Sequence, residues 1–487
     1  MDILTLLIFI PFVTGFAVLV LPINANMSRN IGLFVSIITL ILAFDVYRSF
    51  EAVAGLQMAT IYPWITSYGI VYHIGVDGIS LPILMAIVLL MPALYIVLWH
   101  QNKKGYWANL MILQGGVTGA LLSVDLILFY LFWEMMLLPI FFMIGMYGSG
   151  DRRYIAMKVT LYTMFGSLLM LVSILYLGFN HYDQFGFWSF SLGDLENVKL
   201  THKAMMLTFF GFIIAFAIKI PFFPFHTWMP ATYSNAPTGT VVILSSIMAK
   251  LGVYALLRFV FPIFPELVEH YSDIFIIIGL IGLVYFGVAA LMQNDIKHMF
   301  AYSSGSHLSM IVIGIFSLNI IGLQGSLYLI FAHALATGAL FLMVEHLEHH
   351  TKTKEINHLG GLATSAPIYT IFFGFFMFTV IGLPGTNGFV SELLIILGIF
   401  KVDITAGVIT TTSILLGVSF MLWMFGRVLL GKSREKNLSM PDMPLKDILV
   451  LAPIALLILI MGIYPMPFLE LVEPSLNAQI EFIKGGH

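Results

Sequence analysis

The chain has 487 residues, of which 60% are hydrophobic and 10% charged, with a net charge of −3 and a mean hydropathy of +0.98. This composition excludes an ordinary soluble protein, and the absence of any basic block excludes a partner made of nucleic acid. The chain has no cysteine, which excludes a thiolate-ligated iron–sulfur cluster, a disulfide and a cysteine nucleophile. It also has no glycine-rich nucleotide-binding motif, so no cofactor is expected on this chain.

The apolar residues come in runs of about 20, the length of a helix that crosses a membrane. Fourteen such runs predict an all-α polytopic membrane protein, and the short connections predict one domain over residues 1–487. We expect the first run to be a retained helix, because it lacks the positive flank of a secretory signal. Segment 51–77 is expected to lie at an interface, and the tail 467–487 is weakly amphipathic. The predicted spans cover residues 2–22, 30–49, 78–99, 106–123, 125–147, 154–179, 204–222, 237–260, 272–292, 298–317, 320–346, 367–400, 405–430 and 447–466.

Lysine and arginine are unevenly divided between the two ends of the predicted bundle. If the N-terminus lies outside, 14 of the 22 fall on the inner side, including Lys103, Arg152, Arg434 and Lys436, and 6 fall on the outer side. Cytoplasmic segments carry an excess of these residues. We therefore expect both termini to lie on the outer side.

Two predicted spans, the seventh and the twelfth, are interrupted. In the seventh, Pro221 and Pro224 stand two and five residues after Lys219, and in the twelfth the sequence GLPGTNG occupies residues 382–388. A proline removes a backbone donor, and bare backbone at membrane depth is tolerated only against protein or a water-filled cavity. The breaks are five spans apart, and after an odd number of crossings the equivalent helix runs in the opposite direction through the membrane. The spacing therefore predicts two inverted repeats of five helices, spans 4–8 (residues 106–260) and spans 9–13 (residues 272–430). Many transporters have this arrangement, with their sites at the broken helices.

Six predicted spans carry one ionisable residue deep inside an apolar run. A charge at the centre of a membrane helix costs roughly 2.5–3.5 kcal/mol on insertion scales, so six of them indicate mutual pairing and trapped water, which a proton relay also needs. Simpler interpretations stay open: a structural salt bridge, a lysine that reaches an interface, hydrogen-bonded core histidines, and an interfacial carboxylate. The six residues are Glu134, Lys219, Lys250, His307, His333 and Glu392.

Lys219 is the strongest of these candidates, because it combines a buried charge with a helix break. A nearby carboxylate favours the charged form of a lysine and burial favours the neutral form. A lysine held between the two influences, for instance by Glu134, can exchange its proton. No metal-ligand pair occurs within these spans. The tract EHLEHHTKTKEINH (345–358) has the composition of a metal site, but we expect a solvated inner loop there.

Several motifs together resemble the antiporter-like membrane chains of respiratory complex I and the related cation/proton antiporter complexes. The similarity covers nearly the whole chain, and the motifs stand in the family's order. They are GVDGISLP (75–82), FWEMMLLP (132–139), AIKIPFFPFHTWMP (217–230), NAPTG (235–239), KLGVYALLR (250–258), DIKHMFAYSSGSHL (295–308), FAHALATGALF (331–341) and LPGTNGFVSE (383–392).

The resemblance implies a proton-pumping subunit of NADH:quinone oxidoreductase in a bacterial inner (plasma) membrane. Flavin and iron–sulfur clusters would then lie on partner subunits, and the partners would include two antiporter-like sister chains, the bilayer and, through the complex, the quinone pool. The resemblance also implies that Glu134 is the helix-five glutamate and Lys219 the central lysine. Lys250, His307 and His333 would form the connecting axis. Glu392 in the twelfth span, where two sister chains carry lysine, would be the outlet.

The resemblance leaves other functions open, and the chain departs from the family pattern in places. A multisubunit sodium/proton antiporter and a proton-pumping hydrogenase use the same kind of chain, and a third class is a structural spacer that transmits motion. Many relatives have histidine at Tyr233, and glycine or alanine at Ser245 and Ser246.

Overall fold

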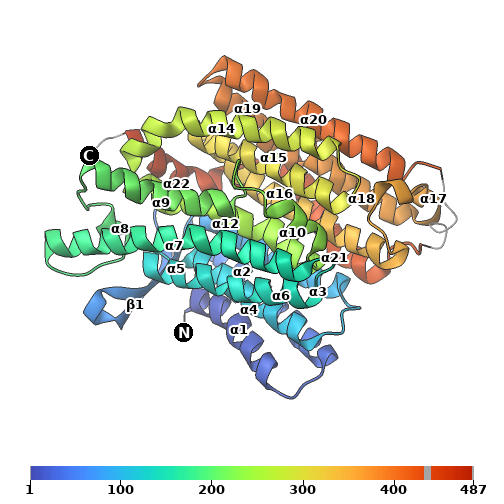
Figure 1. Cartoon of the computed structure of the whole chain (residues 1–487), viewed down its shortest axis with the longest axis horizontal. Coiled ribbons are helices and arrows are strands. Elements are labelled where there is room, and N and C mark those ends of the chain that lie inside the picture. Colours follow the sequence, from blue (N-terminus) through green and yellow to red (C-terminus); the bar gives the residue numbers. More distant parts are fainter. Residues whose placement is uncertain (1, 433–439, 485–487) are drawn as a thin grey trace.

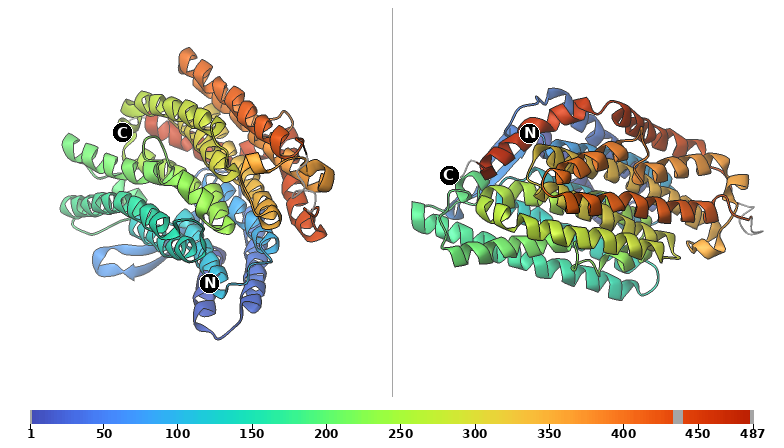
Figure 2. Two further views of the ribbon diagram at one scale, coloured as in Figure 1. Left: turned by 45° about the vertical axis from the view of Figure 1, so that its right-hand side comes forward. Right: turned by 90° about the horizontal axis from the view of Figure 1, so that it is seen from above.

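The computed structural model describes residues 2–432 and 440–484, and consists almost entirely of long helices that run roughly parallel through one bundle (Figures 1 and 2). Asp and Asn side chains cap many of the helices. Asp2 accepts from the Thr5 amide at 2.8 Å and Asn24 from the Met27 amide at 2.8 Å. Such caps satisfy backbone donors that a helix leaves free at its first turn.

The first half of the chain forms a hairpin and the helices of the first eight predicted spans. Its elements are α1 (Ile3–Val20), α2 (Ala25–Ser49), β1 (Gln57–Ile65), β2 (Ile70–Val76), α3 (Ser80–Val97), α4 (Lys104–Leu122), α5 (Leu126–Met135), α6 (Leu137–Tyr147), α7 (Arg152–Phe185), α8 (Leu192–Leu195), α9 (His202–Lys219), α10 (Met229–Asn235), α11 (Thr238–Ile243), α12 (Ala249–Ala255) and α13 (Phe261–Ile263).

The second half forms the remaining predicted spans. Its elements are α14 (Pro265–Leu291), α15 (Ile296–Phe316), α16 (Ile320–Thr351), α17 (Leu362–Ser365), α18 (Pro367–Val380), α19 (Asn387–Phe400), α20 (Ile404–Val428), α21 (Leu445–Ile463) and α22 (Met466–Lys484).

Twelve helical stretches in the described residues are long and apolar enough to cross a membrane. The two other predicted spans are present in a different form. Span 106–123 is α4, which is buried along almost its whole length, and span 367–400 is divided into α18 and α19 at the predicted break. The structure thus has the predicted helical class, with both predicted interruptions.

One element differs from the all-helical expectation. Residues 51–77 contain an antiparallel hairpin of β1 and β2, in which Tyr62 pairs with Tyr72. The hairpin projects from the end of the bundle that also carries α8 (Figure 1). The tail forms α22, which packs on α13, α14 and α16.

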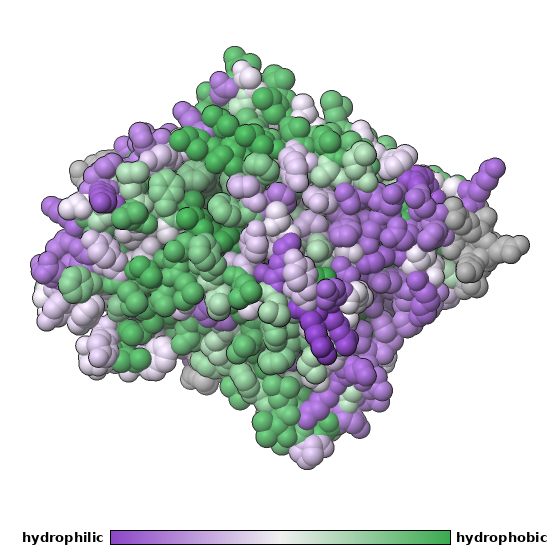
Figure 3. All heavy atoms as spheres, in the orientation of Figure 1, coloured by the Kyte–Doolittle hydropathy of each residue, from purple (hydrophilic) through white to green (hydrophobic). Residues whose placement is uncertain are grey.

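The helices differ sharply in how they are surrounded. The apolar stretches of α16 and of the α11–α13 helix are wholly buried, and that of α15 is nearly so, whereas only 33% of the stretch in α2 and 28% of those in α20 and α21 is buried. Figure 3 shows apolar surface over the middle of the bundle and hydrophilic residues toward its ends, most densely at the right-hand end. In Figure 1 that end carries α17. Arg434 and Lys436, which entered the orientation argument, lie outside the described residues.

Candidate functional site

The six predicted residues come from six different elements of the bundle. Five are buried and Glu134 is half-buried. Lys250 is completely inaccessible, at 0% exposure, so it does not reach an interface. The buried helices α12, α15 and α16 supply Lys250, His307 and His333, and the broken helices supply Lys219 and Glu392. Protein rather than lipid therefore surrounds these residues, which is where ionisable groups within a membrane are tolerated.

Backbone irregularities lie beside the charged residues. Helix α9 ends at Lys219, so the carbonyl end of a helix, which favours positive charge, carries the lysine. Helix α5 ends at Met135, next to Glu134, because Pro139 has no backbone N–H to donate to the Met135 carbonyl. Lys250 lies between two π-helical turns, Leu244–Met248 and Leu256–Val260. Such turns are rare and often mark functional sites. Sequence reasoning missed both turns, because neither has a proline or glycine to signal it.

Lys250 is in direct contact with His333. The lysine Nζ donates to the Ser245 carbonyl and lies 2.8 Å from His333 Nδ1. A charged lysine only donates, so with Lys250 protonated Nδ1 is the acceptor and the ring proton is on Nε2. Nε2 lies 3.2 Å from the Thr337 hydroxyl. The contacts place His333 one step from the lysine and tie the tautomer of its ring to the protonation state of Lys250.

His307 is in contact with Glu392. Its Nδ1 lies 2.8 Å from the Ser303 carbonyl, and its Nε2 lies 2.9 Å from the Val380 carbonyl and 3.2 Å from Glu392 Oε1. Carbonyl oxygens only accept, so both ring nitrogens must donate. The geometry is therefore that of a positively charged imidazole paired with a carboxylate. The rings of His307 and His333 are 5.1 Å apart between centroids, so Lys250, His333, His307 and Glu392 form one continuous line.

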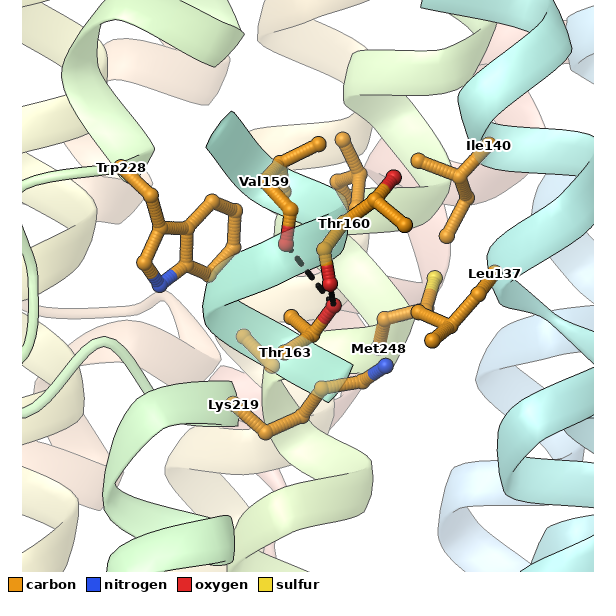
Figure 4. Close-up of a pocket in the computed structure, with 10 residues that line it drawn as sticks. Leu137, Ile140, Val159, Thr160, Thr163, Lys219, Trp228 and Met248 are labelled. Atoms are coloured by element: carbon orange, nitrogen blue, oxygen red, sulfur yellow. Dashed lines mark hydrogen bonds between the residues drawn. The ribbon is translucent and has the colours of Figure 1, made fainter. Parts of the chain in front are cut away.

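Lys219 and Glu134 are not joined by an ion pair in the described part of the chain. Lys219 Nζ lies 4.7 Å from the centroid of the Trp133 ring, within the range of a cation–π contact, and neither Nζ nor Glu134 Oε1 has a hydrogen-bond partner there. Figure 4 shows Lys219 beside a small cavity that Thr160 and Thr163 also line. The cavity measures about 10 Å³, room for about one water molecule.

The end of α9 packs closely on α12. A Cβ at Gly252 would lie 3.3 Å from Lys219 Cβ, and Gly252 is two residues from Lys250. The backbones that carry the two lysines are therefore neighbours.

A buried ion pair that sequence reasoning missed lies near one end of the α11–α13 helix. Arg258 lies 2.6 Å from Asp77, and its Nε donates to the Tyr254 hydroxyl at 2.9 Å. Asp77 also caps α3 through the Ser80 amide at 2.9 Å. The GVDGISLP motif contains this aspartate, but no sequence pattern links it to an arginine 181 positions away. Within residues 2–432 and 440–484, no three His, Asp or Glu side chains are arranged to hold a metal ion.

Comparisons with known proteins place this arrangement in a family. The family model "NADH:quinone oxidoreductase/Mrp antiporter, TM" matches residues 123–417. The chain is 34% identical to NADH-ubiquinone oxidoreductase chain 4 of Chondrus crispus, over 97% of this chain and 96% of that one. It is also 34% identical to NADH-quinone oxidoreductase subunit M of Rhodobacter capsulatus, over 97% and 95%. A chain of the solved structure of respiratory complex I from Thermus thermophilus superposes with a TM-score of 0.91 at 27% identity, over 99% and 100%.

The chain therefore belongs to the family of antiporter-like membrane subunits. Within that family it belongs to the M subunits, also called chain 4, of complex I. The comparisons confirm the predicted family and fold class. They favour complex I over a sodium/proton antiporter or a hydrogenase, the alternatives that the motifs left open.

Proposed function

We propose that Glu134, Lys219, Lys250, His333, His307 and Glu392 form the proton path of this chain, which is a proton-translocating membrane subunit of NADH:quinone oxidoreductase. The observation that supports the path is the line from Lys250 through His333 and His307 to Glu392, with a 2.8 Å contact at one end and a 3.2 Å contact at the other. Proton transfer needs donors and acceptors within hydrogen-bond reach or one water apart. The two ends of the line meet this condition directly; between them the His333 and His307 rings lie 5.1 Å apart, and in this proposal one water joins them.

Lys219 is the central proton carrier in this proposal, and Glu134 controls it. Glu134 is half-buried on α5 beside the exposed side chain of Leu138, so the carboxylate lies where a neighbouring subunit would approach. When Glu134 pairs with Lys219, the charged lysine is favoured. When Glu134 turns toward the neighbouring subunit, burial favours the neutral lysine. The proton then passes to Lys250 and along the histidines, and leaves at Glu392.

The remaining parts of the complex supply the driving energy. Flavin and iron–sulfur clusters on partner subunits oxidise NADH and reduce the quinone pool, and two antiporter-like sister chains lie beside this one. The membrane is the bacterial inner membrane, with both termini on the periplasmic side. The inner excess of Lys and Arg supports this orientation.

Two inverted repeats, residues 106–260 and 272–430, organise the path in this proposal. Each contains one broken helix, α9–α10 in the first and α18–α19 in the second. The packing of the first half of each broken helix supports the correspondence: α9 packs on α7 and α18 packs on α16, in each case the long helix of the preceding span. The proton then crosses between repeats at the contact of Lys250 with His333.

The test is proton pumping by the assembled complex carrying Lys219→Ala or Glu134→Ala. We expect both to abolish or sharply reduce proton translocation into liposomes while the complex still assembles. Lys203→Ala on the same helix and Glu266→Ala on α14, both at exposed positions, are matched controls that should pump normally. Normal pumping by both test variants would contradict the proposed path and would favour a structural spacer instead. Dependence of proton exchange on sodium, without a redox substrate, would favour the antiporter function.

A further inference from the structure

A pocket at one end of the bundle collects histidines from the tract that the sequence suggested as a solvated loop. That expectation is wrong for residues 345–351, because α16 continues to Thr351 and these residues form its last two turns. The pocket has a volume of about 250 Å³ and lies between the ends of α3, α16 and α21. We call it the histidine pocket; it is lined by His100, Glu345, His346, His349, His350, Asp442, Lys446 and Asp447, with Val97, Pro441 and Pro444.

The titratable groups of the histidine pocket touch one another in sequence. The His100 and His349 rings lie 4.2 Å apart, and those of His349 and His350 lie 5.0 Å apart. His100 Nε2 lies 3.1 Å from Glu345 Oε1. His349 and His350 are exposed, His100 is 31% exposed at its side chain, and Glu345 only 14%. The contacts therefore run from solvent to a carboxylate that is mostly buried.

A second set of contacts in the pocket also leads from an exposed histidine to a buried carboxylate. His346 packs against His350, with centroids 4.6 Å apart, and its Nδ1 lies 3.8 Å from Asp447 Oδ2. Asp447 is 4% exposed, and its Oδ1 has no partner in the described part of the chain. Among the surrounding charges, Asp442 and Lys446 also line the pocket, and Lys352 follows the end of α16.

Glu345 connects the pocket to the interior. Its Oε2 accepts a hydrogen bond from the Thr238 hydroxyl at the start of α11. Lys297 Nζ lies 3.2 Å from the same hydroxyl and 2.5 Å from Glu348, so its charge balances the carboxylates. Glu345 is thus the point at which the exposed histidines meet the buried helices.

From Thr238, a seam between two antiparallel helices leads to the proposed proton path. The α11–α12 helix packs against α16 at three successive points. At the first point the Thr238 hydroxyl bonds to Glu345. At the second, the Ser246 hydroxyl faces Gly338, and a Cβ added to that glycine would lie 3.0 Å from the hydroxyl oxygen. At the third, Lys250 contacts His333. Eight residues of helix separate the first two points, about 12 Å. The hydroxyls of Tyr233, Thr240 and Ser246 are buried in this region without a partner among the described residues. Buried polar groups of this kind are the usual sites of internal water.

We propose that the histidine pocket is the proton-collecting site of this chain and that Glu345 passes protons from it into the α11–α16 seam, which supplies the neighbouring lysines Lys250 and Lys219. The proposal rests on the proposed path and adds its source. An exposed imidazole takes a proton from water and becomes charged, and a neighbouring imidazole relays it. Glu345 accepts the proton and becomes neutral. It then releases the proton into the seam and returns to its charged form. Histidine is suited to the first step, because it gains and loses protons near neutral pH.

The test compares the assembled complex with its Glu345→Gln variant and with a triple variant, H346Q/H349Q/H350Q. In liposomes whose NADH-oxidising side faces the medium, the initial rate of proton uptake is measured between about pH 6 and 8.5, and redox turnover is measured in parallel. The triple variant should pump normally at the acidic end, and its rate should then fall roughly tenfold per pH unit, as capture of free protons from water requires. Glu345→Gln lacks the carboxyl that passes protons on, so it should reduce pumping at every pH while redox turnover continues. His358→Gln is the matched control, because His358 is an exposed histidine shortly beyond α16 that does not line the pocket, and it should follow the wild-type profile.

The outcomes separate this proposal from the one on which it rests. Loss of pumping in Lys250→Met with wild-type pH profiles in both pocket variants would overturn the proton-collecting site and leave the proposed path standing. Normal pumping in Lys250→Met would overturn the path itself. If Glu345→Gln assembles and pumps like the wild type at every pH, Glu345 passes no protons from the pocket and the collecting role falls. The triple variant changes mostly exposed side chains, so it remains a test even where Glu345→Gln fails to assemble.

Discussion

Gly382 is predicted to set the position of the carboxylate of Glu392. The glycine lies in the break of the twelfth span with a φ of +70°, and a Cβ added to it would lie 2.7 Å from Glu392 Oε2. Ordinary contact begins at 3.4 Å. The Gly382→Ala substitution must therefore displace the carboxylate by about 0.7 Å at least, if the backbone holds.

The clash falls on Oε2, and Oε1, which pairs with His307, moves with it because the carboxylate is rigid. A shift that lengthens the distance from His307 Nε2 to Oε1 by the full 0.7 Å, from 3.2 Å to about 3.9 Å, sets the upper limit: it reduces the Coulomb attraction by about 0.9 kcal/mol at an effective dielectric constant of 20. That is a change of about fivefold in the equilibrium that keeps the proton on His307. We therefore expect Gly382→Ala to lower proton pumping several-fold while NADH oxidation by the uncoupled complex is less affected.

Gly385→Ala is the matched control in the same break. Gly385 has a φ of +93°, and a Cβ there would meet no atom within 4 Å. Both substitutions impose the left-handed penalty of roughly 1–2 kcal/mol on a residue with a side chain, but only Gly382→Ala touches Glu392. The assay is proton translocation per NADH oxidised, with assembly checked on native gels. Equal pumping by the two variants would refute the proposed importance of the His307–Glu392 distance.

Two further predictions concern stability. Arg258→Met should destabilise the chain by about 3–5 kcal/mol, because it leaves the buried Asp77 carboxylate without its partner. Adding Asp77→Asn, which keeps the cap on α3, should recover most of that stability. An unchanged melting temperature in Arg258→Met would contradict this prediction. Burial raises the pKa of Asp125, which lies between α4 and α5, to about 6. The fold therefore prefers the protonated form, and the stability from this group is lost as the pH rises through about 6. Asp125→Asn keeps the cap on α5, so its melting temperature should exceed that of the wild type above about pH 6, and the difference should vanish below about pH 4.

The parts of the site that sequence reasoning could predict are those with a local chemical cause. Prolines at 221 and 224 and the glycines of 382–388 interrupt helices wherever they occur, so both breaks were predictable. Ionisable residues inside apolar runs stand out in the same way. Contacts between distant segments have no such signal. His100 and Glu345 are 245 positions apart, and only the packing of α3 on α16 brings them together. The hairpin at 57–76 was also missed, because Pro63 lies inside β1 and a proline normally argues against a strand.

The position of Lys250 shows why periodicity alone could not have placed it. Thr238 faces α16, and Lys250 follows it by 12 residues. In a regular helix each residue turns about 100°, so Lys250 would lie about 120° away from the face that Thr238 presents. The π turn at Leu244–Met248 closes with a bond from the Ala249 amide to the Leu244 carbonyl, which accommodates one extra residue. Because the π turn absorbs one residue, the 12 residues from Thr238 to Lys250 rotate the helix only as far as 11 residues of a regular helix would. Lys250 then lies within about 20° of the face that Thr238 presents. The π turn therefore brings Lys250 back onto α16, where it meets His333, and gives a physical reason for an irregular helix at the centre of the proposed path.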